Sequence, residues 1–468
     1  MDLAAVASTP PASDSIAAAL ARANALGRPV LLSVSRALRG VDDLLPLVAA
    51  ARAAGASAAL FERRAGGVAL AGLGAAWAQD AAGPSRIADL ALATRARFAE
   101  AVRDGDTPPV AVAAFGFGDA LPDDDVWRGF PAARVIIPRA ALLRRDGGVA
   151  LLLHTLVEPH ADSAAVAQRL TRSVARLRAW SAAPARAGDD EAATRYATAS
   201  VPEPATWKRA VRDTTADISA QRFAKLVLAR SCHLTATRAF DCGRATARLR
   251  QAYPSCTTFW LGGAAGDFLG ATPEVLARVR AGALETAALA GTTARGTTTA
   301  ADEALGRALV ASDKDRREHA LVVEAIAAAL TPLCRGLVVE PAPRLLRLPN
   351  VQHLLTPIRA RLADDAHLLD VVARLHPTPA VGGHPRAAAL AALAQREGLA
   401  RGWYAGPVGW FDAAGDGEFT VAIRSALVRT HRAVLFAGAG IVAGSDPEAE
   451  LAETRLKLQP LLSALLEL

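Results

Sequence analysis

The chain has 468 residues, of which 52% are hydrophobic, and it carries four cysteines and a net charge of +7. A chain of this length can bury a large core and form either one large domain or two to three smaller ones. The basic residues are scattered rather than massed and the cysteines have neither metal-ligand nor disulfide spacing, which argues against a nucleic-acid surface, a structural zinc site and a disulfide framework.

Residues 1–27 are expected to form a loosely ordered leader that ends in a short Ala-rich helix. The leader lacks a basic start and a continuous apolar run, so it does not have the pattern of a secretory signal peptide. Strand-like apolar runs, separated by turns, then follow at 29–38, 57–74, 109–118 and 133–157. Ala-rich helices are expected at 163–183 and 203–220, and residues 179–194 have the small, charged composition of a surface connection.

The second half of the chain has clearer patterns. The expected strands and hairpins lie at 225–236, 257–263, 275–291, 345–362 and 419–444. A helix after the 275–291 hairpin contains the apolar stretch 319–333, which Glu324 interrupts and which is too short to span a membrane. The last helix is expected to begin with Asp446 as its N-cap and Pro447 at its first position.

Many strands, several helices and no strict βαβ alternation predict an α+β fold with largely antiparallel sheets. We expect a single catalytic domain over 28–468, made of an N-terminal half, 28–200, and a half that carries most of the motifs, 201–468. The cysteine pattern and the lack of signal or membrane-spanning segments favour a cytoplasmic protein that binds neither membrane nor nucleic acid.

Two acidic clusters lie far apart in the chain. Asp315 and Glu318 are three residues apart on one predicted helix face, as are Glu450 and Glu453, with Lys457 four residues further on. Two helices with such carboxylate pairs could meet around one hard cation, and Mg²⁺ favours a site of few carboxylates, waters and an anionic substrate. On spacing alone, two solvated amphipathic helices are the better interpretation, but the motifs between the clusters reverse it.

Three of these motifs have an ordinary and a functional interpretation. Lys225 opens an apolar strand; such a Lys usually extends its ammonium into solvent, whereas a desolvated one could act as a general base. Glu274 follows a Gly-X-X-Pro turn and could lie in the first turn of a helix or, in a closed site, stay protonated as a general acid. Residues 289–296, with Gly291 and Thr292, offer backbone N–H groups for a carboxylate or form an ordinary turn.

Three more motifs follow in the last hundred or so residues. The loop 376–386 fixes His376 and Ala380; a lone His is more often structural than catalytic, and the nine His residues show no metal spacing. Arg424 alternates with small residues on a predicted strand face, which leaves room for a bidentately bound anion, or it is a surface Arg. The string GAGIVAG at 438–444 has the wrong spacing and context for a dinucleotide site.

Taken in their order, the motifs resemble the chorismate-utilising enzymes, the family of isochorismate, salicylate, anthranilate and aminodeoxychorismate synthases. The resemblance is strong from about 220 to 457 and weaker before 200. It rests on the strings KLVLAR, GATPE, LAGTTARG, KDRREH, VQHLLT, LHPTPAVGG, WYAGPVGW, FTVAIRSAL, GAGIVAGSDP and ELAETRLK. The fold that it implies is a single large α+β domain with two stacked, mainly antiparallel sheets flanked by helices.

The resemblance also implies chorismate as substrate and Mg²⁺ as cofactor. Glu318 and Glu453 would ligate Mg²⁺ directly, Asp315 and Glu450 would support it through water, and the metal would hold the ring carboxylate. The residues implied to contact the substrate are Gly291, Thr292, His376, Ala380, Tyr404, Arg424, Gly438, Gly440 and Lys457. The cationic and phenolic side chains of this set would grip the enolpyruvyl carboxylate.

Two positions distinguish members of the family. Lys225 matches the Lys that activates water, which the ammonia-using anthranilate synthases lack, and Ala380 stands where salicylate and anthranilate synthases carry Thr. Together they imply an isochorismate synthase in which Lys225 deprotonates a water that adds at ring C2, while Glu274 protonates the hydroxyl that leaves from C4. A salicylate synthase, which continues to salicylate and pyruvate, is the alternative, and a non-catalytic chorismate-binding homologue is a weaker one.

The resemblance carries expectations about regulation and partners as well. The string ALFERR at 59–64 replaces the Leu-Leu-Glu-Ser motif with which anthranilate synthases bind tryptophan, so feedback inhibition by tryptophan is not expected. Water as nucleophile makes a glutamine amidotransferase subunit unnecessary, and a monomer is expected. His384 departs from the apolar residue that relatives often carry. The product would feed siderophore, salicylate or menaquinone synthesis.

Overall fold

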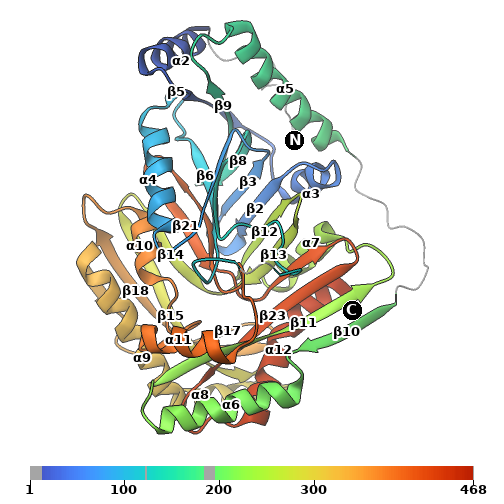
Figure 1. The fold of residues 1–468 in the computed structure, drawn as a ribbon, viewed down its shortest axis with the longest axis vertical. Helices are drawn as coiled ribbons and strands as arrows, with labels where there is room; N and C mark the ends of the chain where they lie inside the picture. Colours follow the sequence, from blue (N-terminus) through green and yellow to red (C-terminus); the bar gives the residue numbers. More distant parts are fainter. Residues whose placement is uncertain (1–12, 122–123, 184–194, 467–468) are drawn as a thin grey trace.

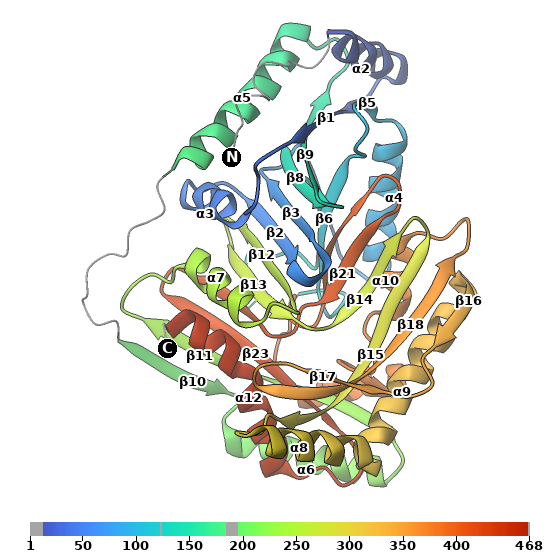
Figure 2. The same ribbon diagram turned by 180° about the vertical axis from the view of Figure 1, so that it is seen from behind.

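A computed structural model describes residues 13–121, 124–183 and 195–466, which form two stacked β-sheets with helices on their outer faces (Figures 1 and 2). In these ranges the sheets, here called sheet A and sheet B, contain 13 and 10 strands. Strand β1 pairs with β5 in parallel, and the other strand pairs recorded in the described ranges are antiparallel. The predicted α+β fold with two mainly antiparallel sheets is therefore confirmed.

The strands of sheet A are, in spatial order, β10 (Tyr196–Val201), β11 (Lys225–Ala236), β23 (Arg432–Ile441), β22 (Ser425–Arg429), β13 (Gly266–Thr272), β12 (Thr257–Gly263), β2 (Ala58–Arg63), β3 (Val68–Leu73), β8 (Ala140–Arg145), β9 (Gly148–Val157), β1 (Val30–Leu38) and β5 (Val102–Asp104), with the short β19 (Gly383–His384) paired to β11. Those of sheet B are β16 (Cys334–Val339), β18 (Val351–Leu362), β15 (Ala283–Ala294), β14 (Val275–Arg280), β21 (Gly417–Val421), β20 (Pro407–Asp412), β6 (Val110–Phe115), β7 (Ala133–Ile137) and β4 (Trp77–Ala81), with β17 (Arg344–Arg347) paired to β18.

Helices cover the outer faces of both sheets (Figures 1 and 2). Those packed on sheet A are α2 (Ser13–Leu26), α3 (Leu45–Ala53), α5 (Ser163–Ala182), α7 (Cys242–Ala252) and α12 (Pro447–Leu466). Those packed on sheet B are α4 (Arg86–Ala99), α8 (Thr299–Ala311), α9 (Asp313–Leu330) and α10 (Leu368–Leu375). Helices α6 (Pro204–Ser219) and α11 (Arg386–Arg396) pack on β11, and short 3₁₀ turns lie at Arg64–Gly66 and Thr331–Leu333.

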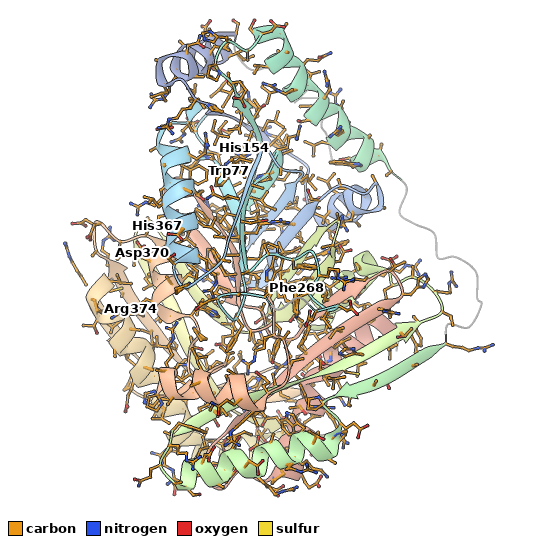
Figure 3. The ribbon with its side chains drawn as sticks, in the orientation of Figure 1. Trp77, His154, Phe268, His367, Asp370 and Arg374 are labelled. Atoms are coloured by element: carbon orange, nitrogen blue, oxygen red, sulfur yellow. The ribbon has the colours of Figure 1, made fainter. Side chains whose placement is uncertain are left out.

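The helices form where apolar residues recur at helical spacing behind a capping group. In α5, Asp162 accepts the backbone N–H groups of the first turn, and Val166, Leu170 and Leu177 are buried on one face. Helix α12 begins as predicted, because Asp446 accepts the backbone N–H of Ala449 at 2.8 Å. At the start of α10, His367 and Asp370 form a reciprocal capping box. Figure 3 labels both residues, together with Arg374 from the last turn of the same helix.

The space between the sheets is filled by aromatic and aliphatic side chains. Phe268 of sheet A lies near the centre of the molecule (Figure 3), with its ring centroid 5.5 to 6.0 Å from those of Phe259, Trp127 and Trp403. Phe115 and Phe419 of sheet B pack against each other with ring centroids 5.9 Å apart. Such a close-packed interior fixes the two sheets relative to each other.

The chain passes between the sheets at two points that matter for the site. Residues between β13 and β14 cross from sheet A to sheet B, and residues between β21 and β22 cross back. The crossings lie side by side, because the N–H of Val421 donates to the carbonyl of Glu274 at 3.0 Å and that of Ala271 to the carbonyl of Arg424 at 3.2 Å. Glu274 and Arg424 are therefore held together at the junction of the two sheets.

These crossings correct two sequence predictions. Residues 419–444 do not form one hairpin, since β21 belongs to sheet B and only β22 and β23 pair as a hairpin in sheet A. Arg424 does not lie on a strand face; its φ of +51° places it in the left-handed region, where the chain turns from one sheet to the other. Glu274 lies at a crossing and not in a helix.

One further segment differs from expectation, because the run 345–362 divides into β17 and β18, which pair around residues 348–350. Within the predicted leader 1–27, the described part contains helix α2, in agreement with the short Ala-rich helix expected there, and Ile16, Ala19 and Ala23 of this helix are buried. The predicted connection 179–194 lies largely outside the described residues.

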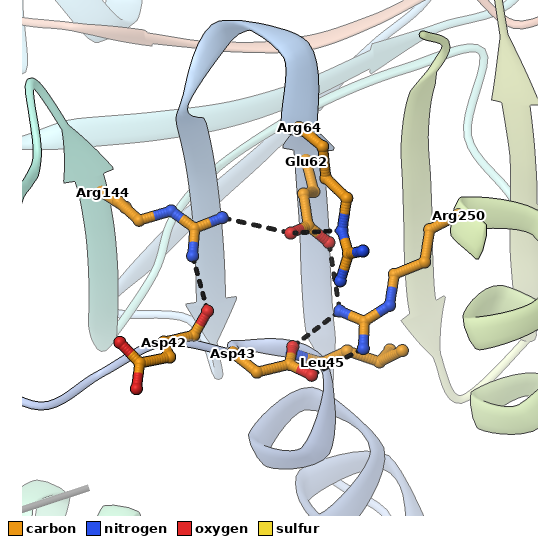
Figure 4. Close-up of polar contacts among 7 residues, drawn as sticks. All are labelled: Asp42, Asp43, Leu45, Glu62, Arg64, Arg144 and Arg250. Atoms are coloured by element: carbon orange, nitrogen blue, oxygen red, sulfur yellow. Dashed lines mark hydrogen bonds and ion pairs between the residues drawn. The ribbon is translucent and has the colours of Figure 1, made fainter. Parts of the chain in front are cut away.

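The segment 59–64 takes part in an ion-pair cluster on the outer side of β2 (Figure 4). Buried Glu62 contacts Arg144 at 3.1 Å and Arg250 at 3.3 Å. Arg250 also binds both carboxylate oxygens of Asp43 at 2.6 Å, which ties the start of α3 to α7. The polar residues of this strand are thus used to join elements of the scaffold.

Candidate active site

A cavity of about 400 Å³ lies where the two crossings meet β15, β23, α9 and α12. It brings together most of the residues predicted from the sequence, although they come from distant parts of the chain. The predicted residues that line it are Glu274, Gly291, Thr292, Asp315, Glu318, Ala380, Tyr404, Arg424, Gly438, Gly440, Glu450, Glu453 and Lys457.

Lys225 lies immediately behind this lining and is only 1% exposed. Its Nζ is 2.8 Å from Oε1 of Glu318, so the ordinary interpretation of a strand-end ammonium in solvent is wrong. The close approach depends on Gly440 of the neighbouring strand: a Cβ there would lie 2.5 Å from Oε1 of Glu318 and 3.1 Å from Cε of Lys225. A larger residue at this position would force the Glu318 carboxylate to shift and would disturb its contact with Lys225.

The four acidic residues line one side of the cavity, two from α9 and two from α12. Glu450 pairs with Lys314 at 2.9 Å and Glu453 with Lys457 at 2.5 Å. Asp315 accepts a 2.5 Å hydrogen bond from the hydroxyl of Ser312, which caps α9.

Burial and neighbouring carboxylates make this side of the cavity a favourable place for a cation. Burial raises the pKa of Asp315, and repulsion from Glu318 and Glu453 raises it further. Burial and Glu453 likewise raise the pKa of Glu450, against the opposing effect of Lys314. An all-oxygen set of this kind suits Mg²⁺. As placed, however, the described ranges contain no group of three or more His, Cys, Asp or Glu side chains close enough to hold a metal ion, since lysines engage three of the four carboxylates.

Glu274 also lines the cavity and is buried. Burial raises its pKa from 4.5 to about 7, because the cations Lys225, Arg424 and Lys457 offset only part of the desolvation penalty. A carboxyl group that keeps its proton near neutral pH can serve as a general acid. The backbone position of Glu274 at the crossing fixes where that proton can be delivered.

Arg424 is buried, and a neutral histidine orients it. Its NH2 lies 3.4 Å from Nε2 of His353, while Nδ1 of His353 lies 3.0 Å from the hydroxyl of Thr292 and 3.2 Å from the carbonyl of Gly291. Burial and the nearby cations lower the pKa of His353 well below its ordinary value, so the ring is neutral. With its Nδ1 proton directed at the Gly291 carbonyl, His353 offers the Nε2 lone pair to Arg424.

His353 is a site residue that the sequence analysis did not assign. It lies inside the VQHLLT string, which was recognised as a motif, but nothing in one sequence shows that this strand passes beside Arg424. Lys314 and Arg401 also line the cavity without having been predicted. The available signal for Lys314 was its place beside Asp315 at the start of the acidic helix.

The remaining predicted ligands line the wall formed by β23. The ring of Tyr404 stacks on Phe436 with centroids 5.1 Å apart, and the Lys457 ammonium donates to the carbonyl of Gly438 at 2.9 Å. Burial raises the pKa of Tyr404 to about 12, so its hydroxyl stays protonated and can donate to an anion. Residues 438–441 of the GAGIVAG string form the end of β23, in agreement with the prediction that the string does not open a dinucleotide-binding βαβ unit.

His376 does not line the cavity, in contrast to its predicted place among the substrate contacts. It is buried, its Nε2 donates to the carbonyl of Phe117 at 3.1 Å, and burial lowers its pKa to about 3. The neutral ring packs edge-on against Phe117. These contacts with Phe117 anchor the start of the loop that carries Ala380 into the cavity lining.

The described residues contain no helix with the length and apolar character needed to cross a membrane. A cavity with a buried lysine behind it and a carboxyl of raised pKa, four further cationic side chains and four acidic ones in its lining defines an enzyme-like site for a small anionic substrate. Residues 18–466 match the model of the family described as chorismate binding enzyme, and the chain belongs to this family.

Individual relatives agree with this assignment. The chain is 42% identical over 373 residues to a salicylate biosynthesis isochorismate synthase of Pseudomonas aeruginosa, covering 78% of this chain and 76% of the relative. It is 33% identical over 357 residues to the isochorismate synthase MenF of Bacillus subtilis, covering 76% and 74%. The solved structure of MenF, the menaquinone-specific isochorismate synthase from Escherichia coli, superposes with a TM-score of 0.78 at 28% identity, covering 96% of this chain and all of that one.

Proposed function

We propose that this protein converts chorismate to isochorismate. The observation that carries the proposal is the pairing of a buried Lys225 and a protonated Glu274 at one cavity, with the small Ala380 in its lining. The family membership and the names of its relatives support the same reaction.

The cavity suits a dianionic substrate. Arg424, Lys457 and the phenol of Tyr404 lie on one wall, where they can bind the enolpyruvyl carboxylate by charge-assisted hydrogen bonds. The ring carboxylate would lie toward Gly291 and Thr292, near the acidic side. Because that side is itself anionic, the substrate needs a cation between the two sets of carboxylates.

We assign this cation as Mg²⁺, held directly by Glu318 and Glu453 and supported by Asp315 and Glu450. When bound it would neutralise the ring carboxylate and fix its position. The raised pKa values of Asp315 and Glu450 support a cation-binding role, because the same repulsion that favours their protonation favours binding of a positive ion. Each lysine now paired with a carboxylate would have to give up part of that pairing.

Lys225 and Glu274 would carry the proton transfers. Water adds to ring C2 and gives a proton to Lys225, the ring double bonds shift, and the C4 hydroxyl leaves as water with the proton of Glu274. One water enters and one leaves, so the reaction is an isomerisation without net redox change. For Lys225 to accept a proton, its ammonium must first lose its proton and its close pairing with Glu318, which is the carboxylate proposed to bind the cation.

The test is the product profile of purified protein with chorismate and Mg²⁺, with and without EDTA, by liquid chromatography. The proposal requires isochorismate as the sole product and its loss on chelation. Lys225→Ala and Glu274→Ala should both abolish turnover yet still bind chorismate in the presence of Mg²⁺. Salicylate together with pyruvate would identify a salicylate synthase, and binding without any turnover would indicate a non-catalytic homologue.

The wider context is also a proposal. Relatives are named for salicylate and menaquinone biosynthesis, so the isochorismate made here would feed salicylate, siderophore or menaquinone synthesis. We expect a cytoplasmic monomer that needs no amidotransferase subunit, because water and not ammonia is the incoming nucleophile. Size-exclusion chromatography with light scattering would test the oligomeric state.

A further inference from the structure

The strand that carries Lys225 lacks a full neighbour on one side. Toward β23 this strand is paired from Leu226 to Thr235. On its other side, β19 pairs only with Lys225 and Leu226, and β10 pairs only with the residues from Ser231 onward. Between these two short partners the N–H of Val227 donates to the carbonyl of Gly382 at 3.0 Å, whereas the carbonyl of Val227 and the N–H of Ala229 face the gap. A strand interrupted in this way would leave buried polar groups without partners unless something else satisfies them.

A buried ion pair, Arg401 with Glu397, fills this gap. Glu397 accepts the backbone N–H of Ala229 at 2.6 Å, and NH2 of Arg401 donates to the carbonyl of Val227 at 2.6 Å. The two side chains bind each other in a bidentate manner, with Nε–Oε2 and NH2–Oε1 distances of 2.8 Å. They therefore replace the missing strand over the residues that follow Lys225.

The same guanidinium also holds the segment that carries Ala380. NH1 of Arg401 donates to the carbonyl of Val381 at 2.7 Å, and the guanidinium lies 4.1 Å from the ring centroid of Phe117. Arg401 is 4% exposed and its side chain contributes to the cavity lining. One planar group thus spans from the Lys225 strand to the Ala380 segment along the cavity wall.

A buried ion pair is weak evidence for a contribution to stability, because desolvation of both charges offsets much of their attraction. Its geometry points to another role. Four of the five N–H donors of Arg401 have partners in fixed directions. Two of these partners are backbone carbonyls, that of Val227 on the Lys225 strand and that of Val381 beside Ala380. A lysine could keep the charge but could not reach both carbonyls.

We propose that Arg401, oriented by Glu397, is a positioning residue that sets the spacing between the Lys225 strand and the Ala380 segment, where the attacking water must be held. The inference rests on the proposed function, since it assigns a purpose to that spacing. It does not make Arg401 a ligand of chorismate. Loss of Arg401 should therefore reduce the rate of the chemical step much more than the binding of substrate.

The chain offers a matched control in Arg52. Arg52 also binds a carboxylate in a bidentate manner, that of Asp267 at 2.8 and 3.0 Å, and donates to the two carbonyls of Ala56 and Gly263. It does not line the cavity. Arg52→Ala thus removes a similar set of bonds from the scaffold without touching the wall beside Lys225.

The experiment compares Arg401→Lys, Arg401→Ala and Arg52→Ala in the full chain with Mg²⁺ and chorismate, well below each unfolding temperature. For Arg401→Lys we expect kcat to fall about 100-fold, as for a misplacement of about 1 Å, with KM and the calorimetric Kd of chorismate within about threefold. Ethylguanidinium should raise kcat of Arg401→Ala at least about tenfold, because the void opens into the cavity. Arg52→Ala should keep the parental kcat even where its Tm falls.

The inference is overturned if Arg401→Lys keeps a kcat within about twofold of the parent, or if its loss of activity lies wholly in KM. Should the Arg401 variants not fold, Glu397→Gln provides the second measurement: it keeps an acceptor for the Ala229 N–H but loosens the guanidinium, and must lower kcat with KM retained. Turnover by the parent reports on the proposed function separately. A parent that makes no isochorismate refutes that function, and this role with it, whereas an active parent with unaffected variants refutes only the role of Arg401.

Discussion

Glu274→Gln should separate the catalytic role of this carboxyl from its effect on stability. The amide has nearly the same shape as the protonated carboxyl and stays neutral at every pH. Because general acid catalysis contributes typically about 10²- to 10⁴-fold, kcat should fall by at least about 100-fold. The same substitution should stabilise the folded protein at neutral and alkaline pH.

The direction follows from the raised pKa. Folding raises the pKa of Glu274 from 4.5 to about 7, so the folded state binds this proton more tightly than the unfolded state does. The resulting stability is fully present below pH 4.5 and is lost as the pH rises through about 7. A shift of this size corresponds to about 3 kcal/mol. The Gln variant has no proton to lose and keeps its stability over the same range.

Urea unfolding of the parent and of Glu274→Gln between pH 5 and pH 8.5 provides the measurement. The free energy of unfolding of the variant minus that of the parent should increase with pH by ~2–3 kcal/mol and level off above about pH 8. A difference that does not change with pH would refute the argument, because it would show that Glu274 has a similar proton affinity in both states. Aspartate at this position is no substitute, since it shortens the side chain.

Three further predictions follow from the same site. Gly440→Ala should fold but lose at least about 100-fold in kcat/KM, since the added Cβ falls within 2.5 Å of the Glu318 carboxylate; normal activity would contradict the required close approach. Lys314→Met should tighten Mg²⁺ binding about tenfold by calorimetry, because it removes a cation that competes for Glu450, and weaker binding would argue against a metal site there. The kcat/KM of the parent should fall about tenfold per pH unit above about pH 7, as the free enzyme loses the Glu274 proton, whereas a flat alkaline limb would exclude it as the acid.

Local chemistry made part of this structure predictable. Pro447 and Asp446 define the start of a helix wherever that helix packs, and the acidic pairs at spacing three must share a helix face. What could not be predicted is which strands become neighbours. Arg424 was assigned to a strand face because alternation of small residues is typical of strands, but the chain leaves one sheet there with φ at +51° to join the other.

The places of single residues were hard to predict for the same reason. His376 and His353 are both histidines in recognisable strings, and nothing local distinguishes the one that faces Phe117 from the one that contacts Arg424. Both rings are buried, and what separates them is the segment that lies beside each one, which depends on contacts between parts of the chain far apart in sequence. Lys225 shows the reverse case, in which a residue type that is rarely buried is almost fully enclosed by partners that a single sequence does not reveal.

The position of the last strands has a consequence for how the chain is made. Strands β22 and β23 lie between β11 and β13 in sheet A, and β20 and β21 lie between β14 and β6 in sheet B, so each of the four strands from Pro407 onward enters the middle of a sheet. A nascent chain still attached to the ribosome before that point would have two interrupted sheets with exposed strand edges, which are prone to aggregation. We expect folding to be largely post-translational, slow and dependent on chaperones, because the decisive pairings are between segments distant in the sequence.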